Sequence, residues 1–475
     1  MQVDVILTVL VLVIGFYMAW NIGANDVSNA MGTSVGSGAL SLRRAVLVAA
    51  VLEFSGAYFV GSNVSETMQH GLIDTQMFLT EPMILILGMC AALLGTSFWL
   101  QIASYFGWPV STTHAMVGAI IGFGWAIGGV EAVLWGETIS IVMSWIISPV
   151  AAGIISFIIF SILQRNILFA MDPFHATKKL MPLLVFIVFG TFTLSLIFNG
   201  LENLHLNLTF FQALGVALIV GIVAGLIAYL LVKRVSAPEL KTPSLSRHLP
   251  QTVVSLEKAI KHLQRVHVTS FDETQEKVGT LLKEVKHLSH NLKQETSFSE
   301  RTSEYAAVEK MFVFLQILSA CFIAFAHGAN DVANAIGPVA AVLDIIKKGT
   351  VTNASAIPSW LLAFGGFGIV VGLATWGWRV IETIGKKITE LTPTRGFCAE
   401  FGAATTILIA SKLGMPISTT HCLVGAILGV GLARGMRALN LTMLRDIILS
   451  WVITIPTSAI MSILAFYALK AIFLR

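Results

Sequence analysis

Long runs of apolar residues dominate this chain, with short polar links between most of them. The runs lie near residues 5–20, 45–61, 83–105, 114–130, 139–163, 181–199, 209–232, 311–326, 333–346, 359–378, 397–412, 418–433 and 446–474. A straight transmembrane helix needs about 20 apolar residues, so the longer runs predict full spans. The shorter runs, and those broken by Gly or Pro, predict re-entrant segments or half-helices. We therefore expect an all-α, multi-pass membrane protein with about ten to twelve crossings.

The overall composition points to the same class. Of the 475 residues, 56% are hydrophobic and only 12% are charged, and the mean hydropathy is +0.82. Soluble domains carry roughly 25% charged residues. No basic region precedes the first apolar run and no obvious cleavage site accompanies it, so we expect a retained helix. The four cysteines lie in separate apolar segments without CxxC spacing, which favours core packing over a disulfide frame or a metal site.

Two sequence motifs each occur twice. Residues 21–30 read NIGANDVSNA and residues 326–335 read AHGANDVANA, whereas residues 107–122 read GWPVSTTHAMVGAIIG and residues 414–429 read GMPISTTHCLVGAILG. The copies of the first motif are 305 residues apart and those of the second 307, so two whole halves repeat. An odd number of crossings per half would make the repeats inverted, as in many secondary transporters.

The composition changes sharply over residues 233–310, which hold 13 Lys/Arg and 10 Asp/Glu. Helical spacing of apolar residues over 253–266 and 278–292 predicts two amphipathic helices in a hairpin, preceded by a linker over 237–250. The hairpin is expected to be solvated, with a regulatory docking module as the alternative. The basic pair at 233–234 beside a span end favours a cytoplasmic position. The expected segments are a first transmembrane repeat, connecting helices, a soluble helical loop and a second repeat, at 1–163, 164–232, 233–310 and 311–475.

Asp26 and Asp331 are the matching carboxyl groups of the first motif. Charged side chains are costly inside a bilayer and usually serve function there. Gly disfavours helix and Asn and Asp compete for backbone bonds, so we expect each copy to interrupt its helix and line a cavity. Hard cations such as sodium prefer oxygen ligands. The motifs supply such ligands from Asn25, Asp26, Asn29, Asn330, Asp331 and Asn334.

The second motif has the signature of a helix start, because a proline and three hydroxyl residues precede a glycine-spaced apolar run. A helix N-terminus offers N–H donors and a partial positive charge, which suit an anion. The hydroxyls add a cradle for a tetrahedral oxyanion, with plain helix capping as the structural alternative. These residues are Ser111, Thr112, Thr113, Ser418, Thr419 and Thr420. We expect His114 and His421 to hold the turn in shape, with a direct proton relay as the alternative.

Three intramembrane polar residues occur in one half only. Glu53 aligns with Ala363, and Glu400 aligns with Leu93. We expect both acids to bind or couple a cation, although Glu53 could instead simply bond to a neighbouring helix. His327, beside the second copy of the first motif, also has an apolar counterpart.

Neither motif contains Lys or Arg. The negative charge of a buried oxyanion then has to be offset by helix N-termini, together with a co-bound cation or a proton at Asp26 or Asp331. This chemistry favours cation-coupled anion symport by alternating access, with no cofactor beyond the coupling ion. A membrane hydrolase is less favoured, because no carboxylate lies at verifiable triad-like spacing and a catalytic site need not be duplicated. A channel is less favoured because repeated halves fit alternating access better.

The four linked motifs resemble those of the inorganic phosphate transporter (PiT) family of sodium- or proton-coupled symporters. GANDVSNA and GANDVANA, with PVSTTH and PISTTH, carry the resemblance over both hydrophobic halves. It implies an inverted-repeat fold and a homodimer in the plasma or inner membrane that transports inorganic phosphate. It also implies a central phosphate site built from the acids, from Asn29 and Asn334 and from the six hydroxyls, with sodium at Asp26 and Asp331. No nucleic-acid partner is expected.

Because the family includes carriers of other substrates, the resemblance leaves the substrate and the coupling ion of this protein undecided. Some members resemble sulfate carriers, and others resemble proton-coupled carriers of phosphate or metal–phosphate. Phosphate carries a proton near neutral pH that it can donate to a carboxylate, whereas sulfate does not. An acid facing the anion, Asp26 or Asp331, therefore favours phosphate.

Overall fold

The structure is a computed structural model that describes most of the chain. The described ranges are residues 2–200, 208–235, 249–269, 272–299, 303–351, 356–378, 380–381, 391–435 and 441–474. The predicted linker over 237–250 lies outside them up to residue 248, and its last two residues begin a helix.

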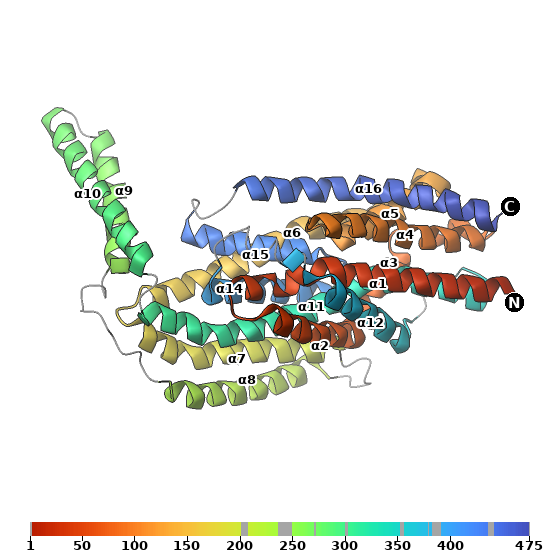
Figure 1. Ribbon diagram of the computed structural model, residues 1–475, viewed down its shortest axis with the longest axis horizontal. Helices are drawn as coiled ribbons and strands as arrows, with labels where there is room; N and C mark the ends of the chain where they lie inside the picture. The colour runs from red at the N-terminus through yellow and green to blue at the C-terminus, as the bar shows by residue number, and fades with distance from the viewer. Residues whose placement is uncertain are drawn as a thin grey trace. The chain divides into compact units, whose positions relative to one another are not determined.

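Helices make up almost all of the described chain (Figure 1). The first half contains α1 (Gln2–Gly36), α2 (Leu42–Val60), α3 (Ser62–His70), α4 (Pro82–Phe106), α5 (Thr112–Gly128) and α6 (Trp135–Leu163). Next come α7 (Pro173–Gly200), α8 (Phe210–Lys233), α9 (Leu249–Thr269) and α10 (Asp272–Ser299). The second half contains α11 (Ser303–Lys348), α12 (Ser359–Thr375), α14 (Pro393–Lys412), α15 (Thr419–Arg434) and α16 (Leu441–Phe473). Short 3₁₀ turns cover Thr75–Phe78 and Val130–Ala132, and a π-turn over Gln164–Leu168 follows α6.

The membrane class and the mixture of full spans and half-helices are confirmed. Among the described residues, seven helices are long and apolar enough to cross a bilayer, and α2 and α3 form an eighth candidate span bent by 65°. The helices α5, α12 and α15 are apolar but shorter. Cys90, Cys398 and Cys422 are buried and Cys321 is partly buried, and none of the four is disulfide-bonded.

The two halves are inverted relative to each other. Thr33 lies after Asp26 on α1, and Ser319 lies before Asp331 on α11, yet both donate hydrogen bonds to Glu400. Asp26 and Asp331 also lie close together. The two helices must therefore run past each other in opposite directions, which is the arrangement expected of an inverted repeat.

The expectation that the first motif interrupts its helices is wrong. Both α1 and α11 run through it without a break. The Asn side chains do not compete for their own backbone, because they bond to neighbouring segments instead. Asn25 donates to Ser104 Oγ and to the Trp108 carbonyl, at 3.0 and 3.3 Å. Asn330 makes the equivalent pair of bonds in the other half.

The glycines of this motif serve close helix crossings. A Cβ atom on Gly328 would lie 2.1 Å from the Glu53 carbonyl oxygen, and one on Gly23 would lie 1.9 Å from that of Ile369. Only glycine lets α11 approach α2, and α1 approach α12, this closely. The mirrored contacts make Ile369 the structural counterpart of Glu53, so the alignment of Glu53 with Ala363 is wrong.

The described residues fall into two compact units. One holds residues 1–160, 186–222 and 313–475, and the other holds residues 161–185 and 223–312. The predicted amphipathic hairpin is confirmed in the second unit, where α9 and α10 pack side by side (Figure 1). In the same unit, the Tyr305 hydroxyl donates to the Leu168 carbonyl. The sequence-based division into four segments stays a prediction.

Candidate substrate and cation site

The hydroxyl-rich motif begins two short helices, as its sequence predicted. Ser111 is the N-cap of α5 and Ser418 is the N-cap of α15. Each serine Oγ accepts a hydrogen bond from the backbone N–H three residues later, at His114 and His421, at 3.2 Å. The backbone N–H groups of the threonines at each helix start have no hydrogen-bond acceptor within their own helix.

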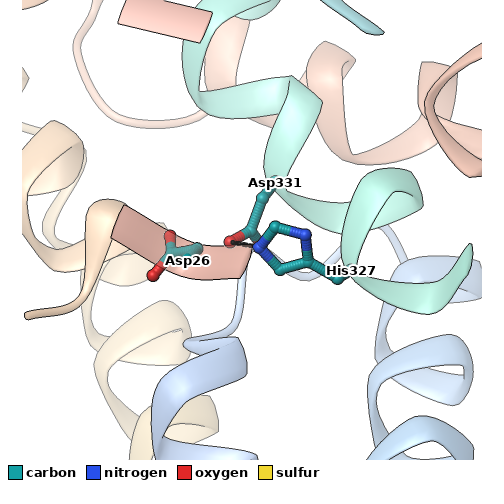
Figure 2. A group of neighbouring side chains, drawn as sticks. All are labelled: Asp26, His327 and Asp331. Atoms are coloured by element: carbon teal, nitrogen blue, oxygen red, sulfur yellow. Dashed lines mark ion pairs between the residues drawn. The ribbon is translucent and has the colours of Figure 1, made fainter. Parts of the chain in front are cut away.

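The two motif carboxyl groups meet at this centre together with a histidine (Figure 2). Asp26, His327 and Asp331 are at most 1% exposed, and their potential ligand atoms lie within 4.8 Å of one another. His327 Nε2 is 3.2 Å from Asp331 Oδ2, the pair drawn with a dashed line in Figure 2. Sequence reasoning placed both acids at matching depth but gave His327 no partner.

Threonines from both short helices converge on these acids. Thr419 Oγ1 donates to Asp331 Oδ2 at 3.0 Å, and Thr112 Oγ1 donates to the same oxygen at 3.3 Å. Thr420 Oγ1 donates to Asp26 Oδ1 at 3.4 Å. The acids of α1 and α11 are thus joined to the N-termini of α5 and α15.

The last asparagine in each copy of the first motif, Asn29 or Asn334, links the two halves. Asn29 Nδ2 donates to Thr420 Oγ1 at 2.8 Å and to Asp26 Oδ1 at 2.9 Å. Asn334 Nδ2 donates to Thr113 Oγ1 at 3.2 Å and to Thr112 Oγ1 at 3.4 Å. Each motif therefore bonds to the helix start of the opposite half, and neither half completes the site alone.

This centre holds an excess of buried oxygen acceptors. Six of them have no hydrogen-bond donor within the described part of the chain. They are Asn25 Oδ1, Asp26 Oδ2, Asn29 Oδ1, Asn330 Oδ1, Asp331 Oδ1 and Asn334 Oδ1. Buried polar groups without partners are rare and costly, and oxygen-only sets suit hard cations.

Glu53 also reaches this centre, through His327. His327 Nδ1 is 3.4 Å from Glu53 Oε1, and both side chains are fully buried. The imidazole therefore bridges Glu53 on α2 and Asp331 on α11. This chain of groups occurs once, because the counterparts of Glu53 and His327 are Ile369 and Ile22.

Glu400 belongs to a second polar cluster. Its carboxylate accepts bonds from Thr33 at 2.5 Å, from Ser34 at 2.6 Å and from Ser319 at 2.5 Å, and Gln316 Nε2 lies at 3.4 Å. Ser319 precedes Asp331 by twelve residues on α11, about 18 Å along the helix. Glu400 and the motif acids are therefore not one site.

The hydroxyl and amide partners of Glu400 were missed from the sequence. The available signal was a polar Gln and Ser inside an apolar run, and a Thr-Ser pair shortly after the first motif. The counterparts of these polar residues in the other half are all apolar, which supports a specific role for the polar cluster around Glu400. Those counterparts, together with that of Glu400, are Val11, Ile14, Leu93, Pro338 and Val339.

The structure is that of an integral membrane protein with inverted helical halves around one buried polar site, an arrangement typical of transporters. Comparison with known proteins specifies the family. The sequence pattern of the phosphate transporter family matches residues 22–462. The chain belongs to this family, whose members are transporters and not enzymes.

Individual relatives match over nearly the whole chain. A Chlamydia pneumoniae protein that carries the name phosphate permease is 44% identical over 471 residues, covering 98% of this chain and 99% of that protein. The Arabidopsis thaliana inorganic phosphate transporter 2-1, chloroplastic, is 44% identical over 459 residues, covering 95% of this chain and 70% of that protein. The solved structure of a sodium-dependent phosphate transporter shares 35% identity with a TM-score of 0.76, covering 98% of this chain and 100% of that one.

Proposed function

We propose that this protein is a symporter that moves inorganic phosphate across the membrane together with sodium, by alternating access. Membership of the phosphate transporter family supports the substrate. Similarity to a sodium-dependent phosphate transporter of known structure supports the coupling ion. The observation that carries the proposal is the buried centre where two acids, two helix N-termini and unpaired oxygen acceptors come together.

Phosphate would bind between the starts of α5 and α15. The N–H groups at these helix starts are donors that a tetrahedral oxyanion requires, and the threonine hydroxyls would join them by turning from the acids to the anion. Protonated phosphate can also donate to Asp26 or Asp331, which sulfate cannot do. Ser111 and Ser418 contribute mainly by capping, since each Oγ accepts a backbone N–H.

Sodium would bind the unpaired oxygens of the first motif, at Asp26 and Asp331 with Asn25 and Asn330. A sodium ion at an acid offsets its charge and lets a phosphate anion approach, although neither motif carries Lys or Arg. Glu400 is the candidate for a further sodium ligand, because three hydroxyl groups and an amide surround its carboxylate.

Proton coupling is the second candidate, and a specific contact favours it. The chain from Glu53 through His327 to Asp331 could pass a proton to the centre. In that case the protein would be a proton-coupled carrier of phosphate or metal–phosphate with the same fold. We further propose a homodimer whose 233–310 segment lies on the cytoplasmic side.

Ligand binding to the purified protein tests the proposal. Sodium and phosphate sharing one centre must each raise the affinity for the other by the same factor. Labelled phosphate should bind at least about tenfold more tightly in sodium than in an equal concentration of choline, and excess phosphate but not sulfate should displace it. Equal binding in both salts would refute sodium coupling.

A further inference from the structure

Two tryptophans occupy equivalent places behind the phosphate cradle, which is formed by the starts of α5 and α15. The ring of Trp145 on α6 packs at a tilt against His114, with centroids 3.8 Å apart, and Trp451 on α16 stacks on His421 at 3.4 Å. The two histidine rings meet edge to face at 4.3 Å. The four rings therefore form one continuous cluster that joins the starts of α5 and α15.

Mirrored helix contacts establish that Trp145 and Trp451 are counterparts. A Cβ atom on Gly118 of α5 would lie 2.7 Å from the Ile455 carbonyl oxygen of α16. A Cβ atom on Gly425 of α15 would lie 2.2 Å from the Pro149 carbonyl oxygen of α6. Each short helix thus crosses the last helix of the other half, and the tryptophans precede these crossings by four residues.

The tryptophans nevertheless make different contacts. Trp145 Nε1 donates to the Pro416 carbonyl at 3.1 Å, in the loop that precedes α15. The equivalent bond would join Trp451 Nε1 to the Pro109 carbonyl before α5. Trp451 Nε1 instead is buried without an acceptor among the residues that the structure describes.

The threonines next to the histidines also differ between the halves, and again only the loop before α15 is bonded to the other half. Thr113 Oγ1 donates to the Ile417 carbonyl at 3.0 Å. Its counterpart Thr420 donates to Asp26 instead of the loop before α5. Pro416 is buried, whereas Pro109 is half-exposed. The loop before α15 is thus held closed on the first half, and the loop before α5 is not.

Equivalent residues in non-equivalent contacts are expected when inverted repeats exchange conformations between two access states. We propose that Trp145 and Trp451 are alternating positioning residues for the phosphate cradle. In the present conformation Trp145 holds the second loop, and in the oppositely facing state Trp451 holds the first loop through the Pro109 carbonyl. This inference rests on the alternating access of the proposed function.

The hydrogen bond from Trp145 to the Pro416 carbonyl positions the loop before α15 and does not itself contact the substrate. It fixes the loop that orients Thr419 and Thr420, which reach Asp331, Asp26 and Asn29. Loss of one net hydrogen bond from one end state should change the ratio of the two states about two- to tenfold. When both bonds are removed, one from each state, their effects on this ratio should cancel.

Tryptophan-to-phenylalanine variants test this in the full-length protein, because Phe keeps a ring on the histidine but removes the indole N–H. Amide hydrogen exchange over residues 107–114 and 414–421 reports the closure of each loop. In the wild type, the second segment should exchange more slowly than the first. Trp145→Phe should speed exchange in 414–421 and slow it in 107–114, and Trp451→Phe should do the reverse.

The double variant is the decisive control. Its ratio of exchange rates between the two segments should return to within about twofold of the wild type, whereas a purely structural role would add the two defects. Changes in the same direction in both single variants, or a double variant with a more displaced ratio than either, would overturn the proposal. If one single variant does not fold, the other still decides through the direction of its shift. Exchange requires neither uptake nor sodium, so a failure of sodium coupling would be seen separately in the phosphate-binding assay.

Discussion

Substituting Gly328 by alanine tests whether backbone contact between α11 and α2 holds the centre together. The added Cβ atom would lie 2.1 Å from the Glu53 carbonyl oxygen and 2.7 Å from its carbonyl carbon. Ordinary contacts of a Cβ atom begin near 3.4 Å, so the helices must separate by about 1 Å. Overpacking typically costs 1–3 kcal/mol, and a rigid backbone partner puts this site at the upper end, about 3 kcal/mol. Alanine regains about 1 kcal/mol of helix propensity, which leaves a net loss of about 2 kcal/mol.

Gly215→Ala on α8 is the matched control, because no atom lies within 4 Å of its added Cβ. It should be neutral or stabilising by up to about 1 kcal/mol. Thermal unfolding of both purified variants, followed by intrinsic tryptophan fluorescence, should give Gly328→Ala the lower midpoint. Phosphate binding by Gly328→Ala should also weaken, because separating the helices stretches the contact between His327 and Glu53. Equal midpoints for the two variants would refute the close crossing.

Three further sets of variants address the proposed roles directly. Asp26→Asn and Asp331→Asn should each lower initial phosphate uptake at least about tenfold at unchanged membrane abundance, since hydrogen bonds to a charged group contribute about 1.5–3 kcal/mol. Near-normal uptake in both variants would exclude a cation site at these acids. Glu400→Gln should raise the sodium concentration needed for half-maximal uptake, whereas Leu93→Met at the equivalent apolar position should not; identical sodium curves would remove Glu400 from coupling. Deleting 251–295 should leave phosphate binding intact, and lost binding in a folded deletion variant would assign the hairpin to the transport machinery.

Much of the fold could be predicted because hydrophobic run length and internal repetition are properties of the sequence itself. The starts of α5 and α15 followed from proline and hydroxyl residues, whose capping is a local interaction. The continuity of α1 and α11 could not be predicted locally. Propensity argued for a break at the first motif, but Asn25 and Asn330 find partners on other helices, and the motif glycines allow helix crossings.

The duplicated residues of the candidate site were predictable together with their partners, whereas for the residues that occur in one half only the sequence indicated Glu53 and Glu400 but not what they contact. The family resemblance of the duplicated motifs implied that Asp26 and Asp331 share one central site, and the two acids do lie close together. The bridge from His327 to Glu53 and the partners of Glu400 occur in one half only, so no repeat drew attention to them. The counterpart of Glu53 was misassigned because apolar helices align ambiguously, and only mirrored contacts establish the register.

Labelled phosphate uptake into proteoliposomes, driven by an imposed sodium gradient or by an imposed proton gradient, tests sodium-coupled symport most directly. We predict uptake against the phosphate gradient with inward sodium, blocked by excess unlabelled phosphate but not by sulfate, and little uptake with protons alone. Uptake driven by protons without sodium would contradict sodium coupling and would assign Asp26 and Asp331 to proton transfer.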